Sequence, residues 1–98
     1  MHANVTSGEI LSGKMDEFIK IYDESVKPVV EKIPGLQNLY VLTDDQNNKG
    51  LIIAVYKNQE DAHNANADGH YQAAVGKLAS TLVLESIARN SYSVSIKI

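Results

Sequence analysis

The segment Leu51–Tyr56 constrains the fold more than any other part of the sequence, because its apolar residues occupy both alternating positions of a strand. Such a strand needs apolar cover on both faces, and the centre of a covered sheet supplies it. The strand-like segment Leu36–Thr43 precedes it, and the polar loop 44–50 joins the two. A short polar loop between apolar runs is typical of an antiparallel hairpin. We therefore expect a sheet with Leu51–Tyr56 near its centre.

An amphipathic helix is predicted over Met15–Ile33, where apolar residues recur at three- and four-residue steps and charged residues occupy the opposite side. Pro28 lies inside this pattern and lacks an amide hydrogen, so we expect it to bend the helix. Pro34 should end the helix, because the residue before a proline avoids helical angles. The segment Ala3–Leu11 alternates in the manner of a strand and comes before the helix.

The second half of the chain predicts a broken helix followed by a long strand. Asn58 is a good helix cap and begins a weak helix that reaches Ala67. The pair Asp68–Gly69 should break this helix, after which a second apolar stripe runs from Tyr71 to Leu82. The segment Glu85–Ile98 alternates between apolar and polar residues and reads as the last strand.

The order strand, helix, strand, strand, helix, strand predicts a ferredoxin-like α+β fold, with both helices on one face of a four-stranded antiparallel sheet. The length of 98 residues fits a single domain over 1–98. The other face of the sheet would be open and apolar on the hairpin, and no loop is long enough to cover it. We therefore expect a homodimer that packs sheet against sheet.

Composition narrows the function classes. The formal net charge of −3 gives no basic surface for nucleic acid or anionic membranes, and the absence of cysteine excludes disulfides and thiolate sites. No apolar run resembles a signal peptide or is long enough to span a bilayer, so a cytoplasmic location is expected. Glu60 and His63 have a spacing found in di-iron proteins, but no second copy of the motif exists, so we expect no metal site.

Three segments resemble the antibiotic biosynthesis monooxygenase domain, a family of the dimeric α/β-barrel superfamily. They are Gly13–Phe18, Pro34–Leu36 and Gly50–Ala62. The resemblance implies a homodimer with a pocket between each sheet and its own helices. Some members of the family oxidise quinols or anthrones with molecular oxygen and no cofactor, and others degrade haem. This chain has no tryptophan, and Ala73–Gly76 lacks the histidine ligand of the haem-degrading members, so haem degradation is not expected.

Oxidation without a cofactor needs a dry cavity, a base that removes a proton, and a donor for the resulting oxyanion. Asn4, near a first-strand position used in the family, is the candidate donor. His70 is the candidate base because imidazole titrates near neutral pH, and the hydroxyl of Tyr71 is a candidate catalytic group in the pocket. Each also has a structural interpretation: a hydrogen-bonded strand residue, a solvated histidine and a core tyrosine.

Tyr22, Tyr56 and His63 are candidate ligand-binding residues, again with core or surface roles as alternatives. No phosphate-binding loop is present, so no cofactor is expected, and the ligand class that fits is a small hydrophobic or aromatic molecule. The sequence thus favours a cofactor-independent monooxygenase-like protein acting on an aromatic or quinol substrate. A non-catalytic ligand-binding or stress-related dimer, and an isomerase or lyase on the same scaffold, stay open.

Overall fold

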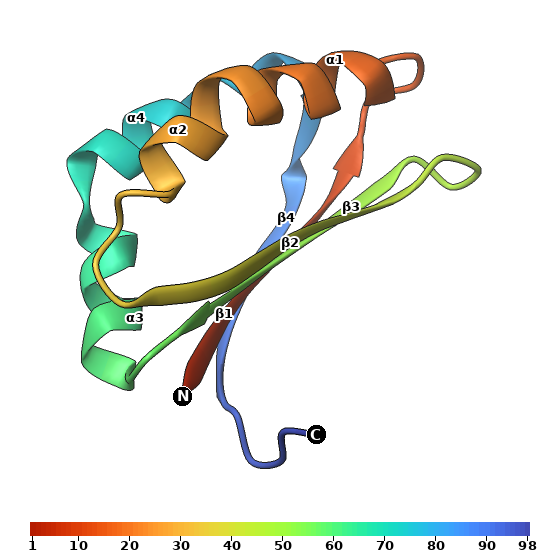
Figure 1. The fold of residues 1–98 in the computed structure, drawn as a ribbon. Coiled ribbons are helices and arrows are strands. Elements are labelled where there is room, and N and C mark those ends of the chain that lie inside the picture. Colours follow the sequence, from red (N-terminus) through yellow and green to blue (C-terminus); the bar gives the residue numbers. More distant parts are fainter.

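The computed structural model describes residues 1–98, and it places one antiparallel sheet beneath a layer of helices (Figure 1). The four strands are β1 (His2–Ile10), β2 (Leu36–Asp44), β3 (Lys49–Tyr56) and β4 (Leu82–Ser93). They lie in the order β2-β3-β1-β4, so the two central strands are β3 and β1. The predicted ferredoxin-like α+β fold is confirmed, as is the central place of Leu51–Tyr56 in the sheet.

The first helical segment is interrupted before Pro28. It consists of α1 (Met15–Ile21), a π-helical turn over Tyr22–Val26, and α2 (Lys27–Val30). The Lys27 amide donates to the carbonyl of Tyr22, five residues back. Because Pro28 has no amide hydrogen, the regular helical ladder cannot continue through it, and the wider π turn absorbs the mismatch. The predicted irregularity is confirmed, although the helix ends at Val30 rather than at Ile33.

The second helical segment is divided as predicted into α3 (Gln59–Ala67) and α4 (Gly69–Gly76). Asn58 caps α3 by accepting a hydrogen bond from the Asp61 amide at 2.8 Å. Asp68 ends α3 and caps α4, accepting from the Tyr71 amide at 2.9 Å. The prediction that the second helix reaches Leu82 is wrong, because α4 ends at Gly76 and a short 3₁₀ turn at Ala79–Thr81 leads into β4.

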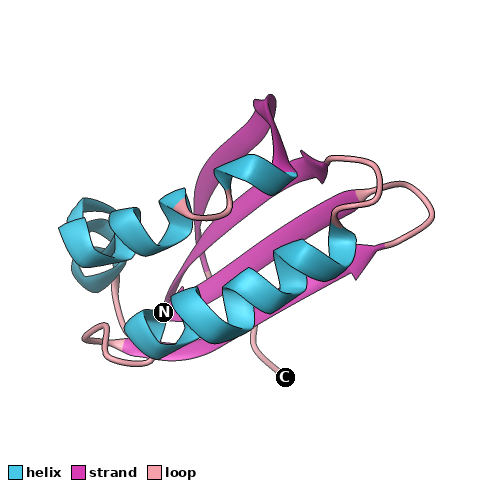
Figure 2. Cartoon of the chain, turned by 90° about the horizontal axis from the view of Figure 1, so that it is seen from above, coloured by secondary structure: helices cyan, strands magenta, loops and turns pink.

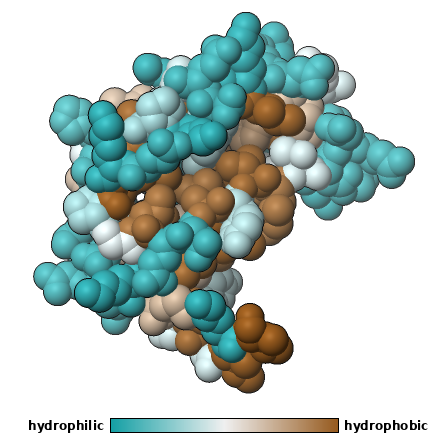
Figure 3. Space-filling model, in the orientation of Figure 1, coloured by the Kyte–Doolittle hydropathy of each residue, from teal (hydrophilic) through white to brown (hydrophobic).

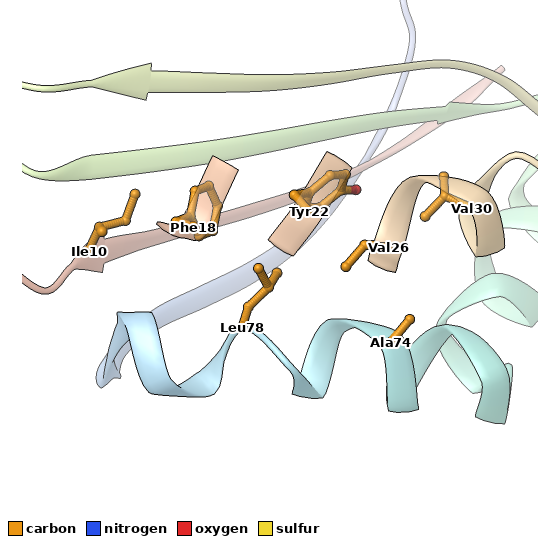
Figure 4. Close-up of a cluster of buried hydrophobic side chains, with 7 residues drawn as sticks. All are labelled: Ile10, Phe18, Tyr22, Val26, Val30, Ala74 and Leu78. Atoms are coloured by element: carbon orange, nitrogen blue, oxygen red, sulfur yellow. The ribbon is translucent and has the colours of Figure 1, made fainter. Parts of the chain in front are cut away.

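Both helical segments lie on the same side of the sheet, where they form two neighbouring rows (Figure 2). Two clusters of buried side chains fill the space between the rows and the sheet. The larger cluster, drawn in Figure 4, consists of Ile10, Phe18, Tyr22, Val26, Val30, Ala74 and Leu78. The smaller cluster consists of Ile33, Ala54, Tyr56, Ala62 and Ala65. Tyr71 packs against both clusters and so joins them.

The last strand differs from its prediction at both ends, since β4 spans Leu82–Ser93 rather than Glu85–Ile98. Its neighbour β1 begins at His2, so the chain beyond Ser93 has almost nothing to pair with. One further bond joins the Val94 amide to the Met1 carbonyl at 3.0 Å. The final residues leave the sheet in Figure 1, and Ile96 is 83% exposed.

The face of the sheet opposite the helices carries apolar side chains. Strand alternation and register place Val5, Ile53 and Tyr40 side by side on this open face, because their neighbours Asn4 and Ala54 face the helices. Tyr40 is 54% exposed. Seen from the side in Figure 3, hydrophobic surface is also visible between the hydrophilic exterior of the helices and the sheet. The expected homodimer stays a prediction.

None of the helices combines the length and apolar character that a membrane crossing requires.

Candidate functional site

A cavity of about 570 Å³ lies between the helix-covered face of the sheet and α4. Strands β1, β3 and β4 and helix α4 supply most of its walls, α1 and α3 add one residue each, and most of the lining is apolar. The apolar and aromatic lining residues are Phe18, Ile52, Ala54, Tyr56, Tyr71, Val75, Leu78, Ala79, Leu82, Leu84 and Ile87. The polar side chains at its edge are Asn4, Thr6, Ser7, Asn66, Gln72 and Arg89. A largely apolar hollow with a few polar groups is typical of a small-molecule site.

An irregularity in β4 shapes one wall of this cavity. The pairing of β1 with β4 shifts register between Ser7 and Glu9. The Ser86 hydroxyl fills the gap, accepting from the Glu9 amide at 2.8 Å and donating to the Val83 carbonyl at 2.6 Å. A bulge adds residues to one strand and re-aims their side chains. As a result both Leu84 and Ile87 line the cavity, although they are an odd number of residues apart.

Asn4 lies at the edge of the cavity and connects β1 to two other elements. Its side-chain nitrogen donates to the Ala62 carbonyl at 3.0 Å and to the Asn66 side-chain oxygen at 3.3 Å. Its side-chain oxygen accepts from the Ser91 hydroxyl at 2.9 Å. Both amide hydrogens are therefore used by α3, and a lone pair on the oxygen is the remaining capacity. Donation to a substrate oxyanion would require Asn4 to release one of the α3 contacts.

Tyr56 and Tyr71 bring two phenol side chains to the cavity. Tyr56 ends β3 and is 1% exposed, and burial raises its pKa to about 12, with the nearby Tyr71 adding to the shift. Burial also raises the pKa of Tyr71, while the Arg89 guanidinium acts in the opposite direction. Both phenols are thus neutral hydrogen-bond donors at physiological pH. Tyr71 and Arg89 both line the cavity, so a neutral donor and a cation contribute to the same hollow.

The remaining sequence candidates lie elsewhere. Tyr22 is buried in the larger core cluster and lines a second cleft beside β2. His63 and His70 are exposed, and neither lines either of these two hollows. The structure thus brings Asn4, Tyr56 and Tyr71 to one cavity and leaves the two histidines outside it.

Sequence reasoning missed six polar residues at or beside the cavity: Thr6, Ser7, Asn66, Gln72, Arg89 and Ser91. Alternation along the last strand does place Arg89 on the same face as Ser91. The sequence did not show which residues of β1 they would face. Ser91 lies opposite Asn4, and Arg89 lies opposite Thr6, because of the register in which β1 pairs with β4.

The chemistry of the cavity is set by what its lining contains. No histidine, aspartate or glutamate lines it, so the cavity offers no carboxylate or imidazole base. Nowhere in residues 1–98 do three or more histidine, aspartate or glutamate side chains come close enough to hold a metal ion. What the cavity offers is a largely apolar space lined by a cation, Arg89, and a phenol, Tyr71, which are groups of the kind that can stabilise negative charge on an oxygen atom.

Comparison with known proteins identifies relatives at the level of family and fold. The family model described as antibiotic biosynthesis monooxygenase matches residues 1–77. No curated protein gives a significant sequence match. SnoaB, a cofactor-independent oxygenase from Streptomyces nogalater, superimposes with a TM-score of 0.80 at 14% identity, covering 99% of this chain and 95% of SnoaB.

Two further solved structures share the fold. Rv0793 from Mycobacterium tuberculosis superimposes with a TM-score of 0.76 at 9% identity, covering 98% of this chain and 96% of its own. An uncharacterized NIPSNAP domain protein from Burkholderia xenovorans gives a TM-score of 0.69 at 17% identity, with both chains covered completely (100% and 100%). At such identities the likeness establishes the shared fold and nothing finer.

Proposed function

The chain belongs to the antibiotic biosynthesis monooxygenase family, as its sequence motifs predicted, and from this premise we propose that it is a cofactor-independent monooxygenase-like protein. Its substrate would be a small aromatic or quinol molecule bound in the cavity between the sheet and α4. The observation that carries the proposal is a largely apolar cavity whose lining includes both the phenol of Tyr71 and the cation of Arg89. SnoaB, which shares the fold, is itself described as a cofactor-independent oxygenase.

The chemistry begins with loss of a proton from the substrate, which leaves an electron-rich anion. This anion passes one electron to molecular oxygen, giving a substrate radical and superoxide side by side in the cavity. Their combination forms a carbon–oxygen bond and, after protonation, a hydroperoxide, and loss of water from a methylene-derived hydroperoxide leaves a carbonyl. For an anthrone, which has a reactive methylene group, the overall change is CH₂ + O₂ → C=O + H₂O. The protein contributes stabilisation of the anion and exclusion of water from the radical pair.

Each polar residue has a proposed role in this sequence. Arg89 lines the cavity but is itself exposed, so its role is to stabilise negative charge on the substrate oxygen once the bound substrate excludes water from that contact. Tyr71 donates a hydrogen bond to the same oxygen and stays neutral, since burial raises its pKa. Tyr56, the last residue of β3, contacts the bound substrate from the sheet. Asn4 positions α3 and offers its free lone pair to a substrate hydroxyl.

Oxygen consumption tests the function. Wild-type protein should consume oxygen above the uncatalysed rate with at least one member of a panel of anthrones and quinols. Arg89→Gln should lower kcat/KM about a hundredfold, within the range seen when a transition-state charge loses its partner. His63→Ala is the matched control, because His63 is exposed and lies outside the cavity. A wild-type rate equal to the uncatalysed rate across the panel would overturn the proposal.

The base role expected for His70 has its own test. The His70 side chain is exposed and does not line the cavity, although it precedes Tyr71 in α4. Anthrones and quinols are acidic enough to ionise in part without a protein base. We therefore propose that the substrate loses its proton to solvent, so that His70→Ala keeps the wild-type rate. Loss of the neutral-pH limb of the rate profile in His70→Ala would instead assign the base role to this histidine.

A non-catalytic ligand-binding role is the second candidate, and one observation favours it. The cavity lining contains no histidine or carboxylate, so any proton transfer inside it depends on phenols or on the ligand itself. A pure binding protein needs no such group. Saturable binding of aromatic molecules without oxygen consumption would decide for this second role.

We also propose that the protein is a homodimer that pairs through its open sheet face. The support is the apolar row across that face, where the half-buried Val5, Ile53 and Val55 are flanked by the exposed Tyr40 and Tyr92. A contiguous apolar patch of this kind is unusual for a monomer. The cavity lies on the other face of the sheet, so pairing in this way leaves it available to a ligand.

A further inference from the structure

A second cleft, of about 490 Å³, lies between the first helical segment and the edge strand β2. It shares no lining residue with the cavity beneath α4. Its floor is apolar and is formed by Ile19, Val30, Leu36, Leu39 and Val41. The open sheet face lies on the opposite side of β2, because the floor residues Leu39 and Val41 point toward the helices. The cleft is therefore accessible even if the open faces pair.

One buried polar group in the wall of this cleft has no partner. Tyr22 lines the cleft and is 5% exposed, and its hydroxyl is fully covered and forms no hydrogen bond. Figure 4 shows this hydroxyl pointing away from Phe18, toward the side of the cluster where Val30 lies. Buried hydroxyl groups in folded proteins almost always have a partner, because leaving one unpaired is costly. A phenylalanine would fill the same space without that cost, so the hydroxyl calls for an acceptor.

The charges around the cleft indicate what kind of acceptor fits. Asp23, Lys27 and Glu31 lie at its rim, and Lys27 pairs with Asp23 at 3.8 Å. The net charge of the three is negative, which disfavours an anionic ligand. Burial, with smaller contributions from Tyr71 and Tyr56, raises the pKa of Tyr22 well above its usual value. The phenol therefore keeps its proton and acts as a donor, and the complementary group is a neutral acceptor such as a carbonyl oxygen.

We propose that the cleft beside β2 binds a neutral, largely apolar ketone, whose carbonyl oxygen accepts a hydrogen bond from the Tyr22 hydroxyl. This site is separate from the proposed oxygenase cavity and does not depend on its activity. Because the hydroxyl is covered in the free protein, we expect binding to displace one of the half-buried floor side chains, Leu36 or Leu39.

The test uses two probes that differ in one oxygen atom, 9-fluorenone and its hydrocarbon analogue fluorene. Both are titrated into ¹⁵N-labelled wild-type protein and into Tyr22→Phe, with amide shifts reporting affinity and location. Wild type should bind 9-fluorenone about tenfold more tightly than Tyr22→Phe does, the effect of one hydrogen bond to an otherwise unpaired buried donor. Fluorene should bind both proteins equally. The shifted amides should belong to the segments 19–31 and 36–43.

Thermal stability without ligand separates recognition from a structural role. Because the Tyr22 hydroxyl has no partner, Tyr22→Phe should melt at or above the wild-type temperature. A second variant, Thr43→Trp, fills the exposed mouth of the cleft and should weaken binding of both probes. Three results would each overturn the inference: equal affinity of 9-fluorenone for wild type and Tyr22→Phe, shifts confined to α4 and β4, or a lower melting temperature for ligand-free Tyr22→Phe.

Discussion

Replacing Asn4 by alanine should detach α3 from the sheet more than it damages any chemistry. The substitution removes a 3.0 Å hydrogen bond to the carbonyl of Ala62, a residue that is 1% exposed, together with weaker contacts to Asn66 and Ser91. Leaving a buried acceptor short of a partner costs about 1–3 kcal/mol, whereas water replaces the contacts of exposed partners. We expect a loss of about 2 kcal/mol in the free energy of unfolding. For a domain of this size that lowers Tm by about 10 °C.

Urea denaturation followed by circular dichroism measures this loss directly. Ser91→Ala is the matched control, because it removes one exposed contact to the same side chain and should cost about 0.5 kcal/mol or less. Asn4→Asp should be at least as harmful as Asn4→Ala, since a carboxylate oxygen would then face the Ala62 carbonyl oxygen. An unfolding free energy of Asn4→Ala equal to that of wild type, combined with lost oxygen consumption, would refute this structural role and support a direct catalytic one.

Four further substitutions test other parts of the structure. Gly35→Ala should lose about 2 kcal/mol or more, because Gly35 has a φ of 79° and an added Cβ would overlap the Asp61 side chain. Gly76→Ala is the contrasting case, because Gly76 is helical and an added Cβ would meet no other atom. Its free energy of unfolding, measured by chemical denaturation, should equal or exceed that of wild type. Tyr56 alone should lower wild-type stability by on the order of 1–3 kcal/mol between pH 10 and 12, because its pKa is about 12 in the folded chain and about 10 in the unfolded chain, and the raised pKa values of Tyr22 and Tyr71 act in the same direction. Tyr56→Phe should reduce the loss of stability between pH 10 and 12, and an unchanged loss would contradict the role given to Tyr56. Sedimentation velocity should find the wild type as a dimer and Ile53→Glu as a monomer, because the substitution places a charge on the apolar open face. A monomeric wild type would contradict the proposed interface.

The order of the elements could be read from local sequence signals. Alternation identified the strands, and helical spacing identified the first helix. Asn58 and the Asp68–Gly69 pair located the start and the break of the second helical segment, because caps and breakers act within a few residues. These features depend on the chain near them, which is why the sequence carried them.

Features that depend on contacts between distant segments could not be read in the same way. Alternation continues past Ser93, but a strand ends where its neighbour ends, so the tail to Ile98 is not part of the sheet. The bulge at Ser86 needs the opposing Glu9 amide, and the register of Arg89 follows from that pairing. His63 and His70 were candidates because of the chemistry of imidazole. Both lie on the exposed side of the helices and therefore outside the cavity.

A crystal structure of the protein with a bound hydroxyanthraquinone, an oxidised analogue of the proposed anthrone substrates, most directly tests where the chemistry takes place. We predict electron density for the rings between α4 and the sheet. One carbonyl or hydroxyl oxygen of the ligand should lie within hydrogen-bonding distance of Tyr71 and Arg89. Density against the open sheet face, or rings in the cavity with no oxygen near Arg89, would contradict the proposed site.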